Sequence, residues 1–266
     1  ENADGLAIFA GAGFGVDSGL EQYRGDDGLW TKSIKLNNKS VNYYDLMKPL
    51  AFKEDPELAW GLIGYLMEKY DATSPHIGFS ILKEFVLQKE YFIVTSNIDE
   101  HFKKAGFNKK KIFEFHGSIY NTQCMYNIEC GVWDTPYLKV DAENIIASRI
   151  PMCPECNSYC RPNIYLFEDG FFVPEISGEQ QFRYMEWEEK VKMNCRNIVA
   201  IEIGAGKTIS TIRRYAEKFS GDDHALIRIN LNDFEVHKGN QLSIPLGAKE
   251  SLLRMKEFLD RGDCPF

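Results

Sequence analysis

Three short runs of residues in this chain could do chemistry on a bound ligand. The first is Gly11-Ala12-Gly13, whose glycines would let the backbone approach a phosphate closely. The second is Ser96-Asn97-Ile98-Asp99, which offers an amide and a carboxylate that can recognise a primary amide. The third is His116-Gly117, an imidazole that can accept a proton near neutral pH, beside a glycine that leaves room for a ligand. Together they predict a site that binds a dinucleotide and has one general base to act on it.

Each of these runs follows an apolar segment that is typical of a buried parallel strand. We expect strands at Leu6–Ala10, Tyr91–Thr95, Ile112–Phe115, Ile198–Ile203, Ala225–Ile229 and Leu242–Leu246. Helical patterns, at 207–219 and 248–259 for example, separate many of them. The alternation predicts an α/β fold with a doubly wound, Rossmann-like parallel sheet, which binds ligands beyond the carboxyl ends of its strands. The candidate residues fall just after those ends, so their placement alone favours a nucleotide site.

A helical insert is expected over 42–90. Asp55-Pro56 is a good N-cap and first-turn pair, and Ser74-Pro75 is expected to start a second helix in the same way. The first of these helices carries an apolar stripe, made of Leu58, Leu62 and Leu66.

A small metal-binding module is expected over 118–168, which holds five of the seven cysteines. The Rossmann-like domain would then comprise 1–117 and 169–266. Five residues separate the first pair of cysteines and a Cys-x-x-Cys spacing joins the second, which predicts a closed tetrahedral zinc site of structural type. The expected ligands are Cys124, Cys130, Cys153 and Cys156. Cys160 is an alternative ligand, and unliganded or redox-active thiols are the alternative to zinc.

The overall composition excludes several classes of protein. A net charge of −8 argues against a general nucleic-acid binder, and no apolar run approaches the ~20 residues that span a bilayer. The clustered cysteines, with no visible secretory signal, indicate a reduced, cytoplasmic protein. Cys195 and Cys264 have no partner in sequence and are expected to be free thiols. The oligomeric state stays open.

The motifs, taken in order, resemble those of the sirtuins, the NAD-consuming protein deacylases. Residues 11–25 are similar to the family stretch Gly-Ala-Gly-x-Ser-x-x-x-Gly-Ile-Pro-Asp-Phe-Arg-Gly, and 95–99 match Thr-Gln-Asn-Ile-Asp with one change. Residues 161–168 look like Arg-Pro-x-Val-Val-x-Phe-Gly-Glu, with Glu168-Asp169 in place of Gly-Glu. Gly204-Ala205-Gly206 stands where sirtuins have Gly-Thr-Ser.

The resemblance implies roles for individual residues. Asn97 would order water and contact the ribose side of NAD, Asp99 would bind the nicotinamide carboxamide, and His116 would deprotonate a ribose hydroxyl. Tyr23 would lie against the nicotinamide side and Arg24 near the phosphates and ribose. The full set of residues implied to bind NAD is Gly11, Ala12, Gly13, Tyr23, Arg24, Ser96, Asn97, Ile98, Asp99, Gly204, Ala205, Gly206, Asn230 and Ala248.

The assignments of Asn97 and Asp99 have a simpler alternative, and a neighbouring histidine is left out of the set. Asn97 or Asp99 could merely cap a helix over 100–105. His101 is one residue out of phase with a histidine that family members often carry, so we expect it to be a packing or solvated side chain.

The predicted function is NAD-dependent deacylation of an acyl-lysine protein or peptide, which releases nicotinamide and O-acyl-ADP-ribose. Protein ADP-ribosyl transfer and NAD hydrolysis are the alternatives, since they share cleavage of the nicotinamide bond and differ only in the acceptor. A nucleotide-sensing or interaction module is the non-enzymatic alternative.

Overall fold

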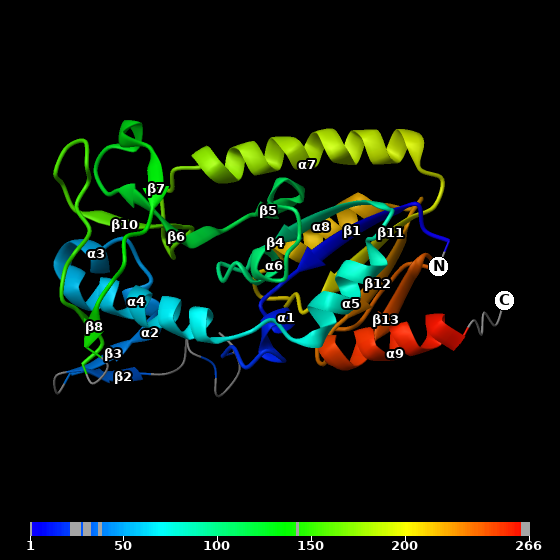
Figure 1. The fold of residues 1–266 in the computed structure, drawn as a ribbon, viewed down its shortest axis with the longest axis horizontal. Helices are drawn as coiled ribbons and strands as arrows, with labels where there is room; N and C mark the ends of the chain where they lie inside the picture. Colours follow the sequence, from blue (N-terminus) through cyan, green and yellow to red (C-terminus); the bar gives the residue numbers. More distant parts are fainter. Residues whose placement is uncertain (1, 22–27, 29–32, 37–38, 142–143, 262–266) are drawn as a thin grey trace. The chain divides into compact units, whose positions relative to one another are not determined.

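A computed structural model describes residues 2–21, 28, 33–36, 39–141 and 144–261 (Figure 1). Tyr23, Arg24 and Cys264 lie outside the described residues. The chain divides into two compact units. The first, here the sheet unit, comprises Glu1–Gly19, Ser74–Phe115 and Glu179–Phe266, and the second, here the cysteine unit, comprises Leu20–Thr73 and His116–Gly178.

The sheet unit is built on a parallel six-stranded sheet, which confirms the predicted fold class. Its order is β13 (Gln241–Ile244), β12 (Ala225–Ile229), β11 (Ile198–Ile203), β1 (Gly5–Ala10), β4 (Glu90–Thr95) and β5 (Ile112–Glu114). All six predicted strands are present. In the central register Ala10 pairs with Ile203 on one side and Thr95 on the other, so these three strands end level with one another. The loops that follow them therefore share one edge of the sheet.

Helices cover both faces of this sheet (Figure 1). Leu6 and Ile8 of β1 point into a core with α5 (Ile77–Phe85), α6 (His101–Lys104) and α9 (Ala248–Arg261). Ala7 and Phe9, one residue out of step, point into the opposite core with α8 (Thr211–Ser220) and residues 184–191 of α7 (Glu175–Asn194). Alternate residues of β1 thus enter two different apolar cores. Because both faces of the strand are buried, its sequence shows no alternation of polar and apolar residues.

The expected helical insert is divided between the units. The cysteine unit holds α2 (Tyr43–Leu46), α3 (Ala51–Glu54) and α4 (Pro56–Ala72), whereas α5 packs on the sheet. The Asp55 cap is confirmed, because its side chain accepts a hydrogen bond from Leu58 N. The Ser74-Pro75 start was wrong: α5 begins at Ile77 and its N-cap is His76, whose ring accepts from Gly78 N.

The cysteine unit contains short antiparallel strands. One sheet has the order β10 (Cys160–Ile164), β6 (Gly117–Cys124) and β7 (Val132–Asp134). Two strand pairs stand apart from it: β2 (Ser33–Leu36) with β3 (Lys39–Asn42), and β8 (Val140–Asp141) with β9 (Ile146–Ala147). The α4 helix joins these parts, since Trp60 Nε1 donates to Cys160 O at 3.0 Å and a Cβ on Gly61 would lie 1.8 Å from Ile145 O.

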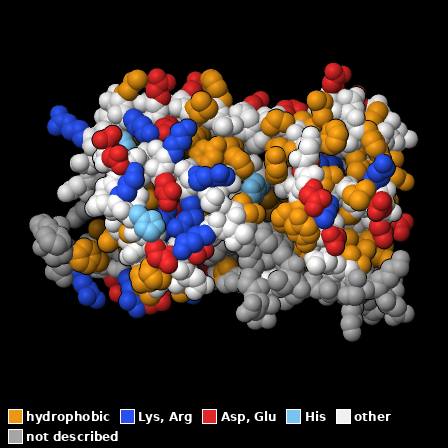
Figure 2. Space-filling view, turned by 180° about the vertical axis from the view of Figure 1, so that it is seen from behind, with side chains coloured by type: hydrophobic (Ala, Val, Ile, Leu, Met, Phe, Trp, Pro, Cys, Tyr) orange, Lys and Arg blue, Asp and Glu red, His pale blue; other side chains and the backbone are white. Residues whose placement is uncertain are grey.

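Within the described part of the chain, no helix is both long and apolar enough to cross a bilayer. On the face shown in Figure 2, Lys and Arg side chains are interspersed with Asp and Glu.

Candidate functional site

The loops after β1 and β11 touch through their backbones. Gly13 N donates to Gly204 O at 3.0 Å, and a Cβ on Gly11 would lie 2.6 Å from that same oxygen. Gly204 has φ +63°, and a Cβ there would lie 2.4 Å from Phe14 N. The glycines are therefore required by this crossing of two loops. Ala12, directly before the short helix α1 (Gly13–Val16), is exposed, so its amide is accessible to an anion, whereas the Gly13 amide is taken by Gly204 O.

Asn97 ties the loop after β4 to the loop after β1. Its Nδ2 donates to Gly11 O at 3.2 Å, while its backbone N donates to Thr95 Oγ1 at 3.0 Å. The side chain is buried, yet its Oδ1 meets no hydrogen-bond donor among the described residues. A buried acceptor left without a donor costs about 1–3 kcal/mol, so a water or ligand donor is expected there.

Asp99 is a buried carboxylate at the same edge of the sheet. Its Oδ1 accepts from His101 N at 2.8 Å, at the first residue of α6, although the N-cap of that helix is Glu100, whose side chain makes no cap hydrogen bond. Burial raises the pKa of Asp99 to about 6, because the charged form loses its hydration. A carboxylate held at such a cost is typical of a functional site.

His101 is fully buried and packs edge-on against Phe79, with ring centroids 5.9 Å apart. The packing interpretation is confirmed and the solvated alternative was wrong.

The third loop at this edge follows β11, and it contacts Asn230, which directly follows the neighbouring strand β12. Asn230 Nδ2 donates to Ala205 O at 3.0 Å, and its Oδ1 accepts from Asp233 N at 3.0 Å. Gly206 is half-buried, and Ala248 is buried at the first residue of α9. The structure thus gathers at one edge of the sheet unit the predicted residues from 11–13, 96–99, 204–206 and 230.

A buried network of charged side chains supports the loop after β11, and the sequence did not predict it. Glu202 of β11 and Arg228 of β12 are opposite each other in register and are joined by hydrogen bonds of 2.8 and 2.9 Å. Arg213 of α8 donates to Ala205 O at 3.3 Å and to Asp233 O at 2.7 Å. The available signal was a lone Glu in one apolar strand and a lone Arg in the next, because such charges are buried only when paired.

His116 belongs to the cysteine unit, directly before β6. It is half-buried, its O accepts from Tyr165 N at 2.9 Å, and its ring lies tilted to that of Tyr165 with centroids 6.4 Å apart. Gly117 has φ +75°, and a Cβ there would lie 2.1 Å from Asn163 O. The glycine is thus required by the close approach of β10, in addition to any room that it leaves for a ligand.

The segment that departs from the family pattern is held by a buried ion pair. Asp169 accepts from Arg161 Nη1 at 2.8 Å, from Phe171 N at 2.9 Å and from Leu166 N at 3.2 Å. Burial would raise the pKa of Asp169, but Arg161 and these amides hold it below its usual value. Glu168 has φ +56°, so it adopts the left-handed conformation that favours glycine.

Four cysteines of the cysteine unit could hold a metal ion. The Sγ atoms of Cys124, Cys130, Cys153 and Cys156 all lie within 4.8 Å of one another. Tetrahedral zinc with Zn–S bonds of ~2.3 Å separates its sulfurs by roughly 3.8 Å, so the set fits zinc without a large rearrangement. The predicted four ligands are therefore the ones brought together. Cys160 lies outside this set, with its Sγ 3.7 Å from Ser158 O.

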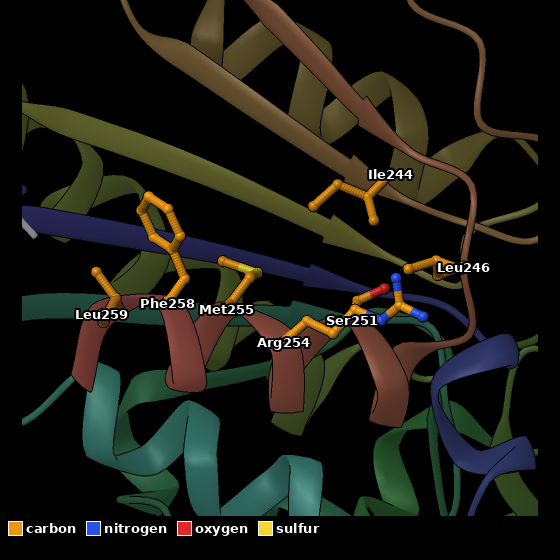
Figure 3. A pocket seen from close by; sticks show the side chains of 7 residues that line it. All are labelled: Ile244, Leu246, Ser251, Arg254, Met255, Phe258 and Leu259. Carbon is orange, nitrogen blue, oxygen red and sulfur yellow. The ribbon is translucent and has the colours of Figure 1, made fainter. Parts of the chain in front are cut away.

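One apolar cavity of about 310 Å³ lies between β13 and α9 (Figure 3). Its lining includes Ile244, Met255 and Phe258, and its one charged residue, Arg254, pairs with Glu250. It lacks the amides and carboxylates gathered at the sheet edge, so it is not the candidate site.

Comparison with known proteins bears on this arrangement. Residues 11–192 match the model of the Sir2 family. The chain belongs to the Sir2 family, as its motifs predicted. It is similar to an NAD-dependent protein deacylase of Pyrococcus furiosus, with 32% identity over 175 residues that cover 64% of this chain and 63% of that protein. It is also similar to one of Thermococcus kodakarensis, with 30% identity over 67% of this chain and 64% of that protein. The similarity thus spans just under two thirds of these relatives' length.

Solved structures of Sir2 homologues share the fold of this Sir2-family chain. A complex of a Sir2 homologue with NAD superposes with a TM-score of 0.70 at 22% identity, covering 98% of this chain and 91% of that one. A mutant Sir2 homologue bound to ADP-ribose gives the same TM-score and identity, with 94% of its chain covered.

Proposed function

We propose that this protein is an NAD-dependent protein-lysine deacylase that releases nicotinamide and O-acyl-ADP-ribose. One observation carries the proposal: Asn97 presents a buried amide oxygen that meets no donor among the described residues, and it bonds to the loop that carries the exposed amide of Ala12. These groups lie at the carboxyl edge of a parallel sheet, where such folds bind nucleotides. The names of the relatives support the same activity.

Each group of residues at the sheet edge binds a different part of the dinucleotide. The loops 11–13 and 204–206 bind the pyrophosphate, with the exposed Ala12 supplying an amide, since the amides of Gly11, Gly13 and Gly204 donate to the protein's own backbone. Asn230 faces the adenosine ribose. Asn97 Oδ1 accepts a hydrogen bond from a ribose hydroxyl or from an ordered water. Ser96 and Ile98 line the loop between them, and Ala248 closes the adenine end. Tyr23 and Arg24 complete the set as sequence-based assignments.

Asp99 recognises the nicotinamide carboxamide. One carboxylate oxygen is held by His101 N, which fixes the orientation of the group. An ionised carboxylate accepts from the NH2 of a primary amide, so Asp99 must be deprotonated to bind. Bound NAD supplies an activated bond between the ribose and nicotinamide, which is the bond that the enzyme breaks.

His116 acts as the general base toward a ribose hydroxyl. A neutral imidazole near pH 7 has the right proton affinity for this step. The acyl-lysine substrate supplies the acceptor oxygen, and water completes the release of the free lysine. Zinc, bound by the four cysteines, has a structural role, since a site closed by four thiolates leaves no position for substrate.

The test is a reaction with NAD in the presence and absence of an acetyl-lysine peptide, with all products identified by mass. We expect nicotinamide and O-acetyl-ADP-ribose only when the peptide is present. Nicotinamide released at the same rate without the peptide would instead show NAD hydrolysis, and ADP-ribose attached to protein would show ADP-ribosyl transfer. His116→Ala is expected to abolish the peptide-dependent products.

A cytoplasmic location is also proposed. It rests on the thiols, because the six cysteines in the described part of the chain are all unpaired.

A further inference from the structure

His76 is a buried histidine with a hydrogen bond at each ring nitrogen. Nδ1 accepts from Gly78 N at 3.0 Å and so caps α5. Nε2 lies 3.0 Å from Phe14 O. Since Nδ1 is the acceptor, the ring is the neutral tautomer that carries its proton on Nε2 and donates it to Phe14 O. The side chain is 8% exposed, so water does not compete for either bond.

Phe14 belongs to α1, which directly follows the exposed residue Ala12. Its own N–H donates to Gly11 O at 3.0 Å, and that oxygen also accepts from Asn97 Nδ2. A continuous series of hydrogen bonds therefore runs from the His76 ring through Phe14 and Gly11 to the side chain of Asn97, whose Oδ1 has no donor among the described residues.

Two more contacts hold the same segment from its far side. His76 N donates to Ser18 Oγ at 3.0 Å, and Asp17 Oδ2 accepts from Lys249 N, at the first turn of α9, at 2.8 Å. Helix α1 has only four residues and no side-chain cap of its own. A helix this short is unstable alone, so its conformation depends on these outside contacts.

The surroundings keep the His76 ring neutral and rigid. Phe14 and Phe79 pack edge-on against it, with centroids 5.2 and 5.1 Å away. Burial lowers the pKa of His76, an effect that the Phe14 carbonyl and Asp17 oppose and that Lys249 and His101 reinforce. The acceptor role of Nδ1 and the donor role of Nε2 are therefore both maintained at neutral pH.

We propose that His76 is a positioning residue for the dinucleotide: its imidazole holds α1, and through it the loop 11–13 with the exposed amide of Ala12, in the conformation that binds the pyrophosphate. This inference rests on the proposed function, since it assigns the loop to that ligand. It makes no use of His76 as a proton donor or acceptor toward substrate.

The test separates the two hydrogen bonds of the ring. In His76→Asn, the amide oxygen can still cap α5, because Asn is a favoured N-cap residue, but no second polar atom reaches Phe14 O. In His76→Ala, both bonds are lost. His224→Asn is the matched control, because His224 precedes β12 and so lies at the opposite end of the strands from the candidate site.

ADP-ribose binding to the full chain, measured by calorimetry, is the main readout. ADP-ribose lacks nicotinamide, so the proposed role of Asp99 does not enter. We expect His76→Asn to bind it about tenfold more weakly, which is the loss of about one hydrogen bond, with a thermal unfolding midpoint close to that of the wild type. The KM for NAD should rise by the same factor, with kcat and the KM for the acyl peptide unchanged.

The possible outcomes distinguish the two proposals. If the wild type does not bind ADP-ribose, the proposed function fails. If the wild type binds and His76→Asn binds as tightly, His76 is only a helix cap and the present inference is overturned. Equal weakening by His224→Asn would overturn it as well, because the loss would then be a general effect of removing an imidazole.

Discussion

The Asn97 side chain donates to the carbonyl oxygen of Gly11 at 3.2 Å, and so links the ends of β4 and β1. Its other atom, Oδ1, is left with no donor in the described part of the chain. A buried amide with only one of its two polar atoms hydrogen-bonded lowers the stability of the folded state, so stability alone does not explain an asparagine here. The hydrogen bond therefore holds the open amide oxygen of the loop after β4 against the loop after β1, which carries the exposed amide of Ala12.

Asn97→Ala should therefore cost far more activity than stability. We expect kcat/KM for NAD to fall about 100-fold or more, because the open oxygen is a ligand contact, whereas unfolding free energy should fall by about 1 kcal/mol. Steady-state kinetics and denaturant unfolding measure the two effects. Asn194→Ala, on the exposed end of α7, should change neither. A variant that unfolds readily but retains its turnover would contradict the assignment.

Asp99→Asn should make the protein more stable at pH 8 and less active. The pKa of Asp99 is raised by burial to about 6 in the folded chain, against 3.8 for the ordinary group. The folded state therefore holds the proton more tightly, and the resulting stability is present below pH 3.8 and is lost as the pH rises through 6. At pH 8 the buried charge costs on the order of 3 kcal/mol, which the uncharged amide avoids.

The measurement for Asp99 is urea unfolding at pH 8 and pH 5, together with the KM for NAD. We expect the stability gain of Asp99→Asn to be smaller at pH 5, and the rise in the KM for NAD to be larger at pH 8 than at pH 5, where the wild-type carboxyl is already mostly protonated. An equal or lower unfolding free energy at pH 8 would show that the carboxylate is compensated by a partner.

The sequence located the strands of the parallel sheet, because buried parallel strands are apolar runs, and the polar residues that follow these runs lie at one edge of the sheet. It missed features that depend on contacts between distant segments. The predicted helix from Lys207 begins only at Thr211, since Lys207 N donates to Asp233 Oδ2 in another loop. The α5 cap was assigned to Ser74 because serine is the commoner cap, but the ring of His76 takes that position.

The role of a glycine was also not decidable from the sequence alone. Gly11 and Gly13 were assigned to phosphate binding, and the structure shows that the crossing with Gly204 requires them in any case. The two explanations are compatible, since a loop packed this closely holds the exposed amide of Ala12, between the two glycines, in a fixed direction. Glu168 shows the converse, because a residue with a side chain occupies a left-handed conformation that glycine would adopt at less cost.

Gly204→Ala should destabilise the sheet unit. The added Cβ would lie 2.4 Å from Phe14 N, and φ is +63°, so the loops after β1 and β11 must separate. We expect a loss of about 2–4 kcal/mol in unfolding free energy and weaker ADP-ribose binding. Gly239→Ala is the control, because a Cβ there would meet no atom within 4 Å. Equal midpoints for the two variants in thermal unfolding would contradict a close crossing.

The cysteine unit should contain one zinc ion per chain. Cys156→Ser removes one of the four clustered thiols, so we expect loss of zinc in elemental analysis and early proteolysis within 116–178. Cys160→Ala and Cys195→Ala should retain the metal, because neither belongs to the cluster. Zinc loss in Cys160→Ala with zinc retained in Cys156→Ser would reverse the ligand assignment.

Two adjacent carboxylates of the cysteine unit should differ sharply when each is replaced by alanine. The Asp169 side chain is fully buried against Arg161, so Asp169→Ala leaves an unpaired buried charge and should cost about 3–5 kcal/mol. The Glu168 side chain is 64% exposed and pairs with Lys48, so Glu168→Ala should change stability by less than about 0.5 kcal/mol. Denaturant unfolding at pH 7 compares them directly. Because the pKa of Asp169 is lowered, its contribution is complete above pH 3.8 and is lost as the pH falls through the folded value, so the difference between the variants should persist unchanged from pH 8 to pH 6.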